Sequence, residues 1–358
     1  MQWQIFSMNF SNILILWYLQ IKRDLPWRKT KDPYLVWLSE IILQQTRVSQ
    51  GISYYLAFSE EFPSVKDLAN ADESRVLKMW QGLGYYSRAR NLHFTAKYIS
   101  KELKGEFPSS YKELTRLKGI GDYTASAIAS ICFNEPSAVV DGNVYRVLAR
   151  FFEINTPINS TQGFKEFKAL AQSLLDISQP GVYNQAIMDF GALQCKPQNP
   201  DCHICPISSG CIAFEKNLVK KLPFKNNKIK IKKKYFNYIV FITNDKKTIF
   251  EERKGKGIWQ GLYQFPLIES LKEVQLDELV SLNDFQRLVP SNSKIKLFNK
   301  KIFVHKLSHQ HLFTKFWIVK SSNIKKASVS WKDIELFPMP VLIANFLNKF
   351  NIKMNENF

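Results

Sequence analysis

The chain has 358 residues, more than one hydrophobic core usually organises, so two domains are expected. Its formal charge of +19 favours a polyanionic partner such as nucleic acid, although a Lys-rich proteome would give the same charge. The longest apolar run, residues 13–19, is too short to span a bilayer of about 30 Å and lacks the flanks of a secretory signal, which excludes these two classes and leaves a cytoplasmic protein.

The N-terminal half shows helical periodicity. From residue 10 to about 190, apolar residues recur at spacings of three and four, and strand patterns are nearly absent. The first helix should open near Asn9, because the residues before Met8 carry no usable pattern. Stop signals predict the helix ends at Gly51, Gly82/Gly84, Gly105/Pro108, Gly119/Gly121, Pro136 and Pro157. This half is therefore predicted to be all-α.

An acidic residue, Glu40, interrupts the apolar segment Trp37–Thr46, which is predicted to be one helix. Helical spacing would place Glu40 on one face with Trp37, Gln44 and Arg47. Burial among Trp and Ile side chains raises the pKa of a carboxyl group, and a raised pKa suits a general acid at neutral pH.

Two further signals follow along the chain. Gly119 and Gly121 precede a predicted helix and would expose backbone N–H groups that can bind a DNA phosphate, although a tight interhelical turn would also need them. Asp141 precedes the predicted helix 144–151, where it is either a simple N-cap or a carboxylate kept ionised by the helix start. One protonated acid and one carboxylate form the pair that glycosidic bond cleavage requires.

Four of the five cysteines form one short segment. They are separated by six, two and five residues, at Cys195, Cys202, Cys205 and Cys211. This spacing indicates metal ligation, and thiolate chemistry alone allows either zinc or a [4Fe–4S] cluster. Cys132 is expected to be a core residue, and His203 is not expected to be a ligand.

The C-terminal region has a different texture. Residues 216–234 are Lys-rich and are interpreted as a linker. Beyond the linker, an α+β domain is predicted over 235–350, followed by a tail, 351–358. Its strands are predicted over 235–242, 248–252, 301–306 and 312–320, and its helices over 270–282 and 341–350.

The glycine turn, the downstream Asp and the cysteine loop together resemble the endonuclease III superfamily of DNA glycosylases. Within it, four segments resemble the adenine DNA glycosylase (MutY) family, namely Leu25–Arg28, Trp37–Thr46, Gly82–Tyr86 and Asp141–Val144. The resemblance covers residues 10–215 densely and the C-terminal region loosely. It implies an all-α helix-hairpin-helix glycosylase domain over 1–215 with a [4Fe–4S] loop at 195–211, followed by a MutT-like (Nudix-like) α+β domain.

The same resemblance implies a monomeric, monofunctional glycosylase of base excision repair that removes adenine paired with 8-oxoguanine or guanine in double-stranded DNA. Glu40 matches the general acid that protonates adenine N7, and Asp141 matches the carboxylate that stabilises the oxocarbenium ion. The other matched residues are the donors Tyr123 and Asn143, the adenine-pocket residues Leu25, Trp27, Arg28 and Gln185, the wedge residues Gln44 and Tyr85, and the lesion contacts Thr46 and Leu83.

Two positions refine this expectation. Strand-cleaving members of the superfamily carry Lys where this chain has Tyr123, and a phenol cannot form the Schiff base. In the C-terminal domain, Gly257–Pro266 resembles the family but the acidic Nudix box is missing, so recognition without hydrolysis is expected. Ser308 and His309 match lesion-contacting residues, while Leu307 replaces the Phe usual in the family.

Three other functions remain as alternatives. A pyrimidine-lesion glycosylase with lyase activity is disfavoured by Tyr123 and by the C-terminal domain. A non-catalytic iron–sulfur protein that binds DNA would have no use for Glu40 and Asp141. A nucleotide pyrophosphatase would need the acidic box that the sequence lacks.

Overall fold

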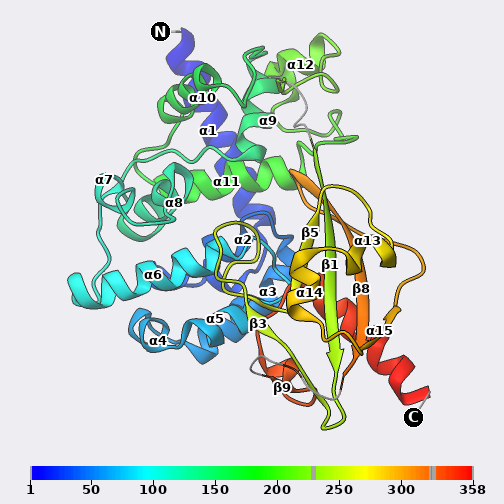
Figure 1. The fold of residues 1–358 in the computed structure, drawn as a ribbon. Helices are drawn as coiled ribbons and strands as arrows, with labels where there is room; N and C mark the ends of the chain where they lie inside the picture. The colour runs from blue at the N-terminus through cyan, green and yellow to red at the C-terminus, as the bar shows by residue number, and fades with distance from the viewer. Residues whose placement is uncertain (1, 227–230, 322–323, 325–327, 357–358) are drawn as a thin grey trace. The chain divides into compact units, whose positions relative to one another are not determined.

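The computed structural model of the chain describes residues 2–226, 231–321, 324 and 328–356. Its backbone packs as two compact units, Met1–Asn70 with Arg90–Asn227 and Ala71–Ala89 with Lys228–Phe358 (Figure 1). These boundaries differ from the predicted ones, because residues 71–89 pack with the C-terminal unit and the predicted linker is divided between the two units. No described helix is long and apolar enough to cross a membrane.

The first unit is helical, and its described residues contain no strand. Its elements are α1 (Gln2–Ile21), η1 (Pro26–Arg28), α2 (Pro33–Leu43), α3 (Val48–Glu61), α4 (Val65–Asn70), α6 (Ser87–Glu102), α7 (Tyr111–Leu114), α8 (Asp122–Phe133), α9 (Gly142–Phe151), α10 (Thr161–Ser173), α11 (Pro180–Leu193), η2 (Ser208–Gly210) and α12 (Ile212–Glu215). The first three residues of α6, 87–89, belong to the second unit, and the rest of the helix belongs to the first.

Three predicted helix boundaries are wrong. Gly51 lies inside α3 (Val48–Glu61) and does not end a helix. α1 begins at Gln2 rather than near Asn9, since neither Gly nor Pro interrupts the segment between them. α2 ends at Leu43, because Gln44 leaves the helical region with φ −55° and ψ 119° and Gln45 has a φ of 58°. Gln44 and Arg47 therefore do not extend the helix face that carries Glu40.

The core of the helical unit lies between α1, α8, α9 and α11 (Figure 1). α1 packs along α11, and the fully buried rings of Tyr183 and Phe190 come from α11. Phe10 of α1 packs against Phe151 of α9 with ring centroids 4.7 Å apart. This packing holds α2, α8, α9 and α11 in fixed positions around the site described below.

The predicted hairpin lies between α7 and α8. Gly119 has a φ of +82°, and a Cβ there would lie 2.7 Å from Asn91 Cβ, so both the turn and the close approach of α6 require glycine. The Thr95 hydroxyl of α6 donates to the Lys118 carbonyl at 2.7 Å. Gly121 is the N-cap of α8, and no side chain caps this helix start. The hairpin thus presents a helix N-terminus on a fixed support.

The second unit is built on a sheet with strand order β5-β1-β8-β6, in which β7 also pairs with β8. β1 and β8 are parallel, with Tyr235 opposite Phe313, and the other pairs are antiparallel. The elements are α5 (Glu73–Met79), β1 (Lys232–Ile242), β2 (Lys247–Thr248), β3 (Glu251–Glu252), β4 (Tyr263–Gln264), β5 (Leu267–Ser270), α13 (Leu276–Val280), α14 (Asn283–Leu288), β6 (Lys294–Leu297), β7 (Phe303–Lys306), β8 (Gln310–Lys320), β9 (Val329–Ser330), η3 (Ile334–Leu336) and α15 (Val341–Glu356).

Several predicted elements of this unit have different bounds. The strand predicted over 248–252 is divided between β2 and β3, and the helix predicted over 270–282 is only α13. β1 begins inside the predicted linker, because its first residues, Lys232 to Lys234, pair in parallel with Gln310 to Leu312 of β8. α15 continues into the predicted tail as far as Glu356. Its buried Phe346 stacks on Phe316 of β8 at 4.0 Å.

Candidate active site

The two acidic residues singled out in the sequence line one cavity of about 230 Å³ in the helical unit. α2 contributes Glu40, and the N-terminus of α9 carries Asp141. The other predicted site residues that line this cavity are Leu25, Trp27, Arg28, Thr46, Tyr123, Asn143 and Gln185. Residues from five separate parts of the chain therefore meet around a space of small-molecule size.

Burial in this cavity raises the pKa of Glu40 to about 7. The neighbouring charge of Asp141 also raises it, whereas a hydrogen bond from Tyr123 and the positive charge of Arg28 lower it. Near neutral pH, Glu40 is thus divided between its protonated and ionised forms, as a general acid requires.

Asp141 has a different environment. It is the N-cap of α9, and the N–H groups of Asn143 and Val144 both donate to its Oδ1 at 2.8 Å. The Asn143 Nδ2 donates to its Oδ2, also at 2.8 Å. Burial nevertheless raises the pKa of Asp141 above its ordinary value and outweighs these bonds. The helix start alone therefore does not lower the pKa of Asp141 in the way that the sequence suggests. Each of these partners is a donor, which matches the ionised carboxylate.

Asn143 connects Asp141 to the surrounding helices. Its Oδ1 accepts from Arg146 Nη2 at 2.8 Å. A Cβ at Gly191 of α11 would lie 2.6 Å from Asn143 Cβ, so the close approach of these helices requires glycine. Tyr123 of α8 places its hydroxyl 3.2 Å from Met188 Sδ and beside Glu40. Both supporting residues of the prediction thus contact an acid.

The far side of the cavity contains a charge network that the sequence analysis missed. Arg28 Nη1 and Nη2 donate to Asp189 Oδ2 and Oδ1 at 2.7 and 2.8 Å, and Arg23 also donates to Asp189. Burial would raise the pKa of Asp189, but these hydrogen bonds hold it below its ordinary value. An acid in the apolar helix α11 was the available signal, and it is the same signal that identified Glu40.

The wedge residues and the lesion contact Leu83 lie in two places. In the helical unit, Gln44 lies outside the cavity lining, and its Nε2 donates to Thr124 Oγ1 at 3.3 Å. In the second unit, Leu83 and Tyr85 belong to a turn in which Gly82, Gly84 and Tyr85 all have positive φ. Trp80 Nε1 donates to the Gly84 carbonyl at 3.0 Å and thereby braces this turn.

Within the second unit, Tyr85 lies beside the predicted lesion-contacting residues Ser308 and His309. The hydroxyl groups of Tyr85 and Ser308 are hydrogen-bonded at 2.6 Å, although 223 residues separate them. His309 is exposed, and its carbonyl accepts from the Lys232 N–H at 3.1 Å at the start of β1. Ser308 is thus joined to a wedge candidate, while His309 is bonded to the start of β1 through its backbone carbonyl.

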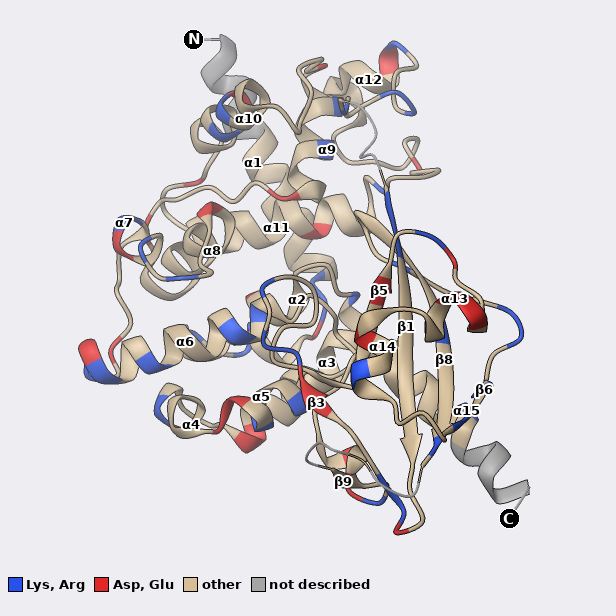
Figure 2. Cartoon of the chain, viewed as in Figure 1, with Lys and Arg blue, Asp and Glu red and all other residues tan. Residues whose placement is uncertain are grey.

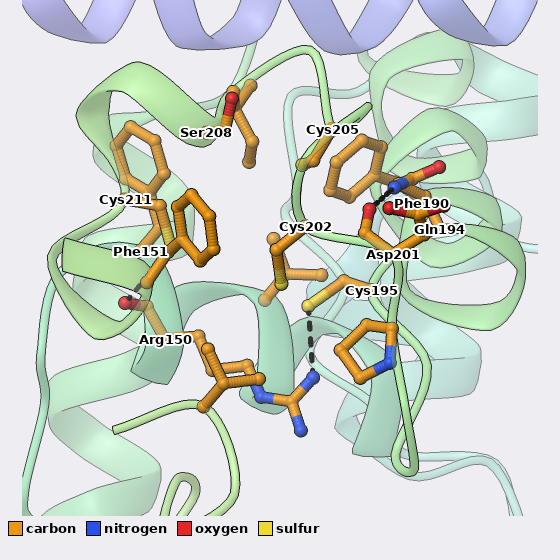
Figure 3. Close-up of a pocket in the computed structure, with 15 residues that line it drawn as sticks. Arg150, Phe151, Phe190, Gln194, Cys195, Asp201, Cys202, Cys205, Ser208 and Cys211 are labelled. Carbon is orange, nitrogen blue, oxygen red and sulfur yellow. Dashed lines mark hydrogen bonds between the residues drawn. The ribbon is translucent and has the colours of Figure 1, made fainter. Parts of the chain in front are cut away.

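The four clustered cysteines line a second cavity of the helical unit (Figure 3). Arg150 of α9 donates from Nη1 to Cys195 Sγ at 3.3 Å. Burial raises the pKa of the Cys205 thiol to about 12, so a thiolate at this position needs nearby positive charge, which bound iron would supply. In the described part of the chain, no three His, Cys, Asp or Glu side chains converge closely enough to hold a single metal ion.

Charged residues also mark the outer surface of the helical unit. Figure 2 shows Lys and Arg along α6 and in the loop that joins α7 to α8. This loop contains Arg116 and Lys118, and the Lys118 ammonium lies 4.2 Å from the centre of the Phe94 ring on α6. Basic side chains beside a free helix N-terminus form a surface that can hold phosphates without reading sequence.

Models of three protein families match the chain. Residues 38–172 match the HhH-GPD superfamily of base excision DNA repair proteins, and residues 237–349 match the NUDIX domain. Residues 195–211 match the iron–sulfur binding domain of endonuclease III, which confirms the predicted iron–sulfur cofactor over zinc. The predicted order of a helical glycosylase domain and a Nudix-like domain is likewise confirmed.

Several curated proteins are similar over long stretches. The adenine DNA glycosylase of Buchnera aphidicola subsp. Baizongia pistaciae (strain Bp) is 37% identical over 319 residues, and the match spans 87% of each protein. The adenine DNA glycosylase of Homo sapiens is 44% identical over 216 residues, which span 58% of this chain and 40% of the human protein.

Solved structures resemble the helical unit. A thermostable thymine-DNA glycosylase matches 59% of this chain and 97% of its own, with a TM-score of 0.55 and 29% identity. Endonuclease III in a non-covalent DNA complex matches 61% of this chain and 98% of its own, with a TM-score of 0.53. At 20% identity, the second match supports the fold alone.

Proposed function

The chain belongs to the adenine DNA glycosylase family, and we propose that it removes adenine paired with 8-oxoguanine or guanine in duplex DNA without cutting the strand. Membership makes it a base excision repair enzyme that hydrolyses N-glycosyl bonds. One observation carries the assignment of its chemistry, namely that Glu40 and Asp141 line a single cavity but have different surroundings.

Glu40 acts as the general acid. Adenine is a poor leaving group as an anion, so its departure requires a proton as the bond between N9 and C1′ breaks. A carboxyl group with a pKa of about 7 carries that proton in a large fraction of molecules at neutral pH. The proton passes to N7 of the flipped adenine, which then leaves as a neutral base.

Asp141 stabilises the positive charge that develops on the sugar. Its two oxygens are held by Asn143 and Val144, so the carboxylate is oriented before the substrate arrives. Water then adds to C1′ and releases one proton to solvent, and Glu40 takes up a proton from solvent, so the hydrolysis is complete and the acid is restored. Tyr123 takes no part as a nucleophile, because a phenol cannot form the imine through which lyases cut the strand.

Binding of the duplex is assigned to surfaces outside the cavity. The N–H groups at the start of α8 and the basic side chains beside them would hold the DNA backbone near Gly119 and Gly121. Gln44 and Tyr85 would support the opened duplex, and Thr46, Leu83, Ser308 and His309 would contact the oxidised guanine. An iron–sulfur cluster on the four cysteines would fix the shape of the loop that carries Lys196.

The test compares four duplexes in single-turnover assays with the intact protein. They carry adenine opposite 8-oxoguanine, adenine opposite guanine, adenine opposite thymine, and an oxidised pyrimidine. Base release is expected in that order for the adenine duplexes, with strand breaks only after alkali treatment. Preferred release of the pyrimidine, or strand cleavage without alkali, would reject the proposal in favour of a lyase of the same superfamily.

A further inference from the structure

Behind the cavity, Tyr18 of α1 lies against the residues that α11 contributes. Its side chain is buried, with 4% of the residue exposed, and it is not part of the cavity lining. The Tyr18 hydroxyl donates to Gln185 Oε1 at 2.6 Å, across 167 residues of sequence. Gln185 itself lines the cavity. Tyr18 thus contacts the pocket through another side chain.

The ring of Tyr18 also contacts the charge network. The guanidinium carbon of Arg28 lies 5.5 Å from the centre of this ring, and both terminal nitrogens of Arg28 bind Asp189. A cation over the ring draws electron density from the phenol, so its O–H is a stronger donor and a weaker acceptor. The hydroxyl therefore favours the oxygen of the Gln185 amide over its nitrogen.

This contact fixes which way the carboxamide faces. With Oε1 held by the Tyr18 O–H, the Nε2 hydrogens and the second lone pair of Oε1 remain for a base in the cavity. Adenine presents a ring-nitrogen acceptor beside a 6-amino donor, which matches that arrangement. Hypoxanthine carries an oxygen acceptor at position 6, and a carboxamide would have to turn over to serve it.

We propose that Tyr18 is a positioning residue that locks the Gln185 carboxamide in the orientation that selects a 6-aminopurine over a 6-oxopurine. The inference rests on the proposed function, because it treats the cavity as the site of the flipped adenine. Asp189 also helps to position Gln185, because it holds Arg28 over the ring of Tyr18. Selection at position 6 thus depends on a residue that does not touch the base.

The experiment measures single-turnover release of adenine and of hypoxanthine, each opposite 8-oxoguanine, by the intact protein. Tyr18→Phe keeps the ring under Arg28 and removes the hydroxyl. Adenine release should fall about 3- to 10-fold, as the loss of one hydrogen bond predicts, while hypoxanthine release changes little. The ratio of adenine release to hypoxanthine release should therefore fall by the same factor.

A matched control is Tyr34→Phe, because the buried Tyr34 hydroxyl donates to the Phe62 carbonyl at 2.7 Å away from the cavity lining. This variant should lose thermal stability and keep the wild-type ratio. Gln185→Ala should abolish most of the preference, and adding Tyr18→Phe to it should change the ratio no further. That last measurement separates an effect through Gln185 from a general weakening of the fold.

The outcomes separate the two proposals. Absence of adenine release by the wild-type protein contradicts the proposed function. Normal adenine release with an unchanged ratio in Tyr18→Phe overturns the role of Tyr18 and leaves the function standing. If Tyr18→Phe does not fold, Gln185→Ala still decides, because an unchanged ratio in that variant excludes orientation of the carboxamide as the source of selectivity.

Discussion

The two units of the molecule use their buried polar groups differently. In the helical unit, Glu40 and Asp141 line a cavity, and burial raises the pKa of both. In the C-terminal unit, buried side chains instead donate to backbone carbonyls of a neighbouring strand or of the segment before α13. Asn237 Nδ2 donates to the Ile268 carbonyl at 3.3 Å, and Lys315 Nζ donates to the Val274 carbonyl at 2.8 Å. The first arrangement keeps reactive groups available, and the second uses hydrogen bonds to specify a sheet.

The residues assigned to lesion recognition in the C-terminal unit also differ from the acids of the helical unit in their exposure to solvent. Ser308 and His309 are exposed, whereas the acids and their supports lie inside the helical unit. Changes in the helical unit should therefore act on the rate of base release, and changes in the exposed loop should act on the choice of opposing base. The following predictions test that division, and a variant that changes both quantities equally would break it.

The largest effect is expected for Glu40→Gln. The amide keeps the shape and the hydrogen-bonding reach of the side chain but has no transferable proton. Release of adenine should fall by about 10² to 10⁴-fold, the usual contribution of general acid catalysis, while affinity for the mispaired duplex is kept. Single-turnover kinetics beside equilibrium binding measure the two quantities.

Glu60→Gln is the matched control, since Glu60 is exposed on α3. It should leave both quantities at the wild-type level. Parallel loss of binding and release in the Glu40→Gln protein would assign Glu40 a structural role instead of a catalytic one.

A slightly smaller loss is expected for Asp141→Asn. Removing the negative charge beside the cationic sugar should slow release by about 10² to 10³-fold. The Asn Oδ1 can still accept from the N–H groups that start α9, so the fold should persist. Its Nδ2 would face Asn143 Nδ2, and a modest fall in melting temperature is therefore expected. A rate within tenfold of wild type would remove Asp141 from the mechanism.

The pH dependence follows from Glu40. The acid must be protonated to act, and its pKa is raised to about 7, so release should fall about tenfold per pH unit above this value. Tyr123→Phe removes a hydrogen bond that lowers the pKa of Glu40 and should shift this fall to higher pH. A rate that rose between pH 7 and 9 would contradict the assignment of Glu40 as the acid.

The sequence predicted the elements that follow from local patterns. Periodic apolar residues indicated the helices of the first unit, and an acid in an apolar helix indicated Glu40. The end of α2 was missed, because Gln45 adopts a positive φ that no sequence pattern marks. β2, β3, β4 and β9 each have two residues, which is too short for an alternating pattern.

The site was predicted as single residues, and the connections between them were not. Asp189 binds Arg28 across 161 residues, and Tyr18 binds Gln185 across 167. Such pairs depend on how α1 and η1 pack against α11, which is a property of the whole fold. The membership of residues 71–89 in the second unit was missed for the same reason.

An intermediate effect is expected when the C-terminal unit is deleted. A chain that ends at residue 226 is the better choice than one that ends at Lys216, because Leu222 is buried in the helical core and the Phe224 carbonyl accepts from Ile158. Adenine release should persist, while the preference for 8-oxoguanine over guanine should fall about tenfold, as the loss of one or two hydrogen bonds predicts. Undiminished preference would refute lesion recognition by this unit.

The intact chain must be tested beside this truncation. Tyr86 donates to the Met339 carbonyl at 3.2 Å, so deletion also removes support from the 71–89 segment. Ser308→Ala with His309→Ala in the full chain leaves that support in place. If the double variant keeps the preference and the truncation loses it, the supported segment rather than the loop recognises the lesion.

The smallest effect is expected at the hydrogen bond between Tyr85 and Ser308. The bond is short at 2.6 Å but exposed, so its loss should change the ratio of release opposite 8-oxoguanine and guanine only about 2- to 10-fold. Tyr85 has a φ of 45°, an unfavourable conformation for a Tyr residue, and the bond helps to hold it there. Because both variants break the same bond, Tyr85→Phe and Ser308→Ala should each lower the ratio, and the double variant should lower it no further. Additive losses would mean that the two hydroxyl groups contact the duplex independently, in which case the exposed loop would recognise the lesion without help from the wedge.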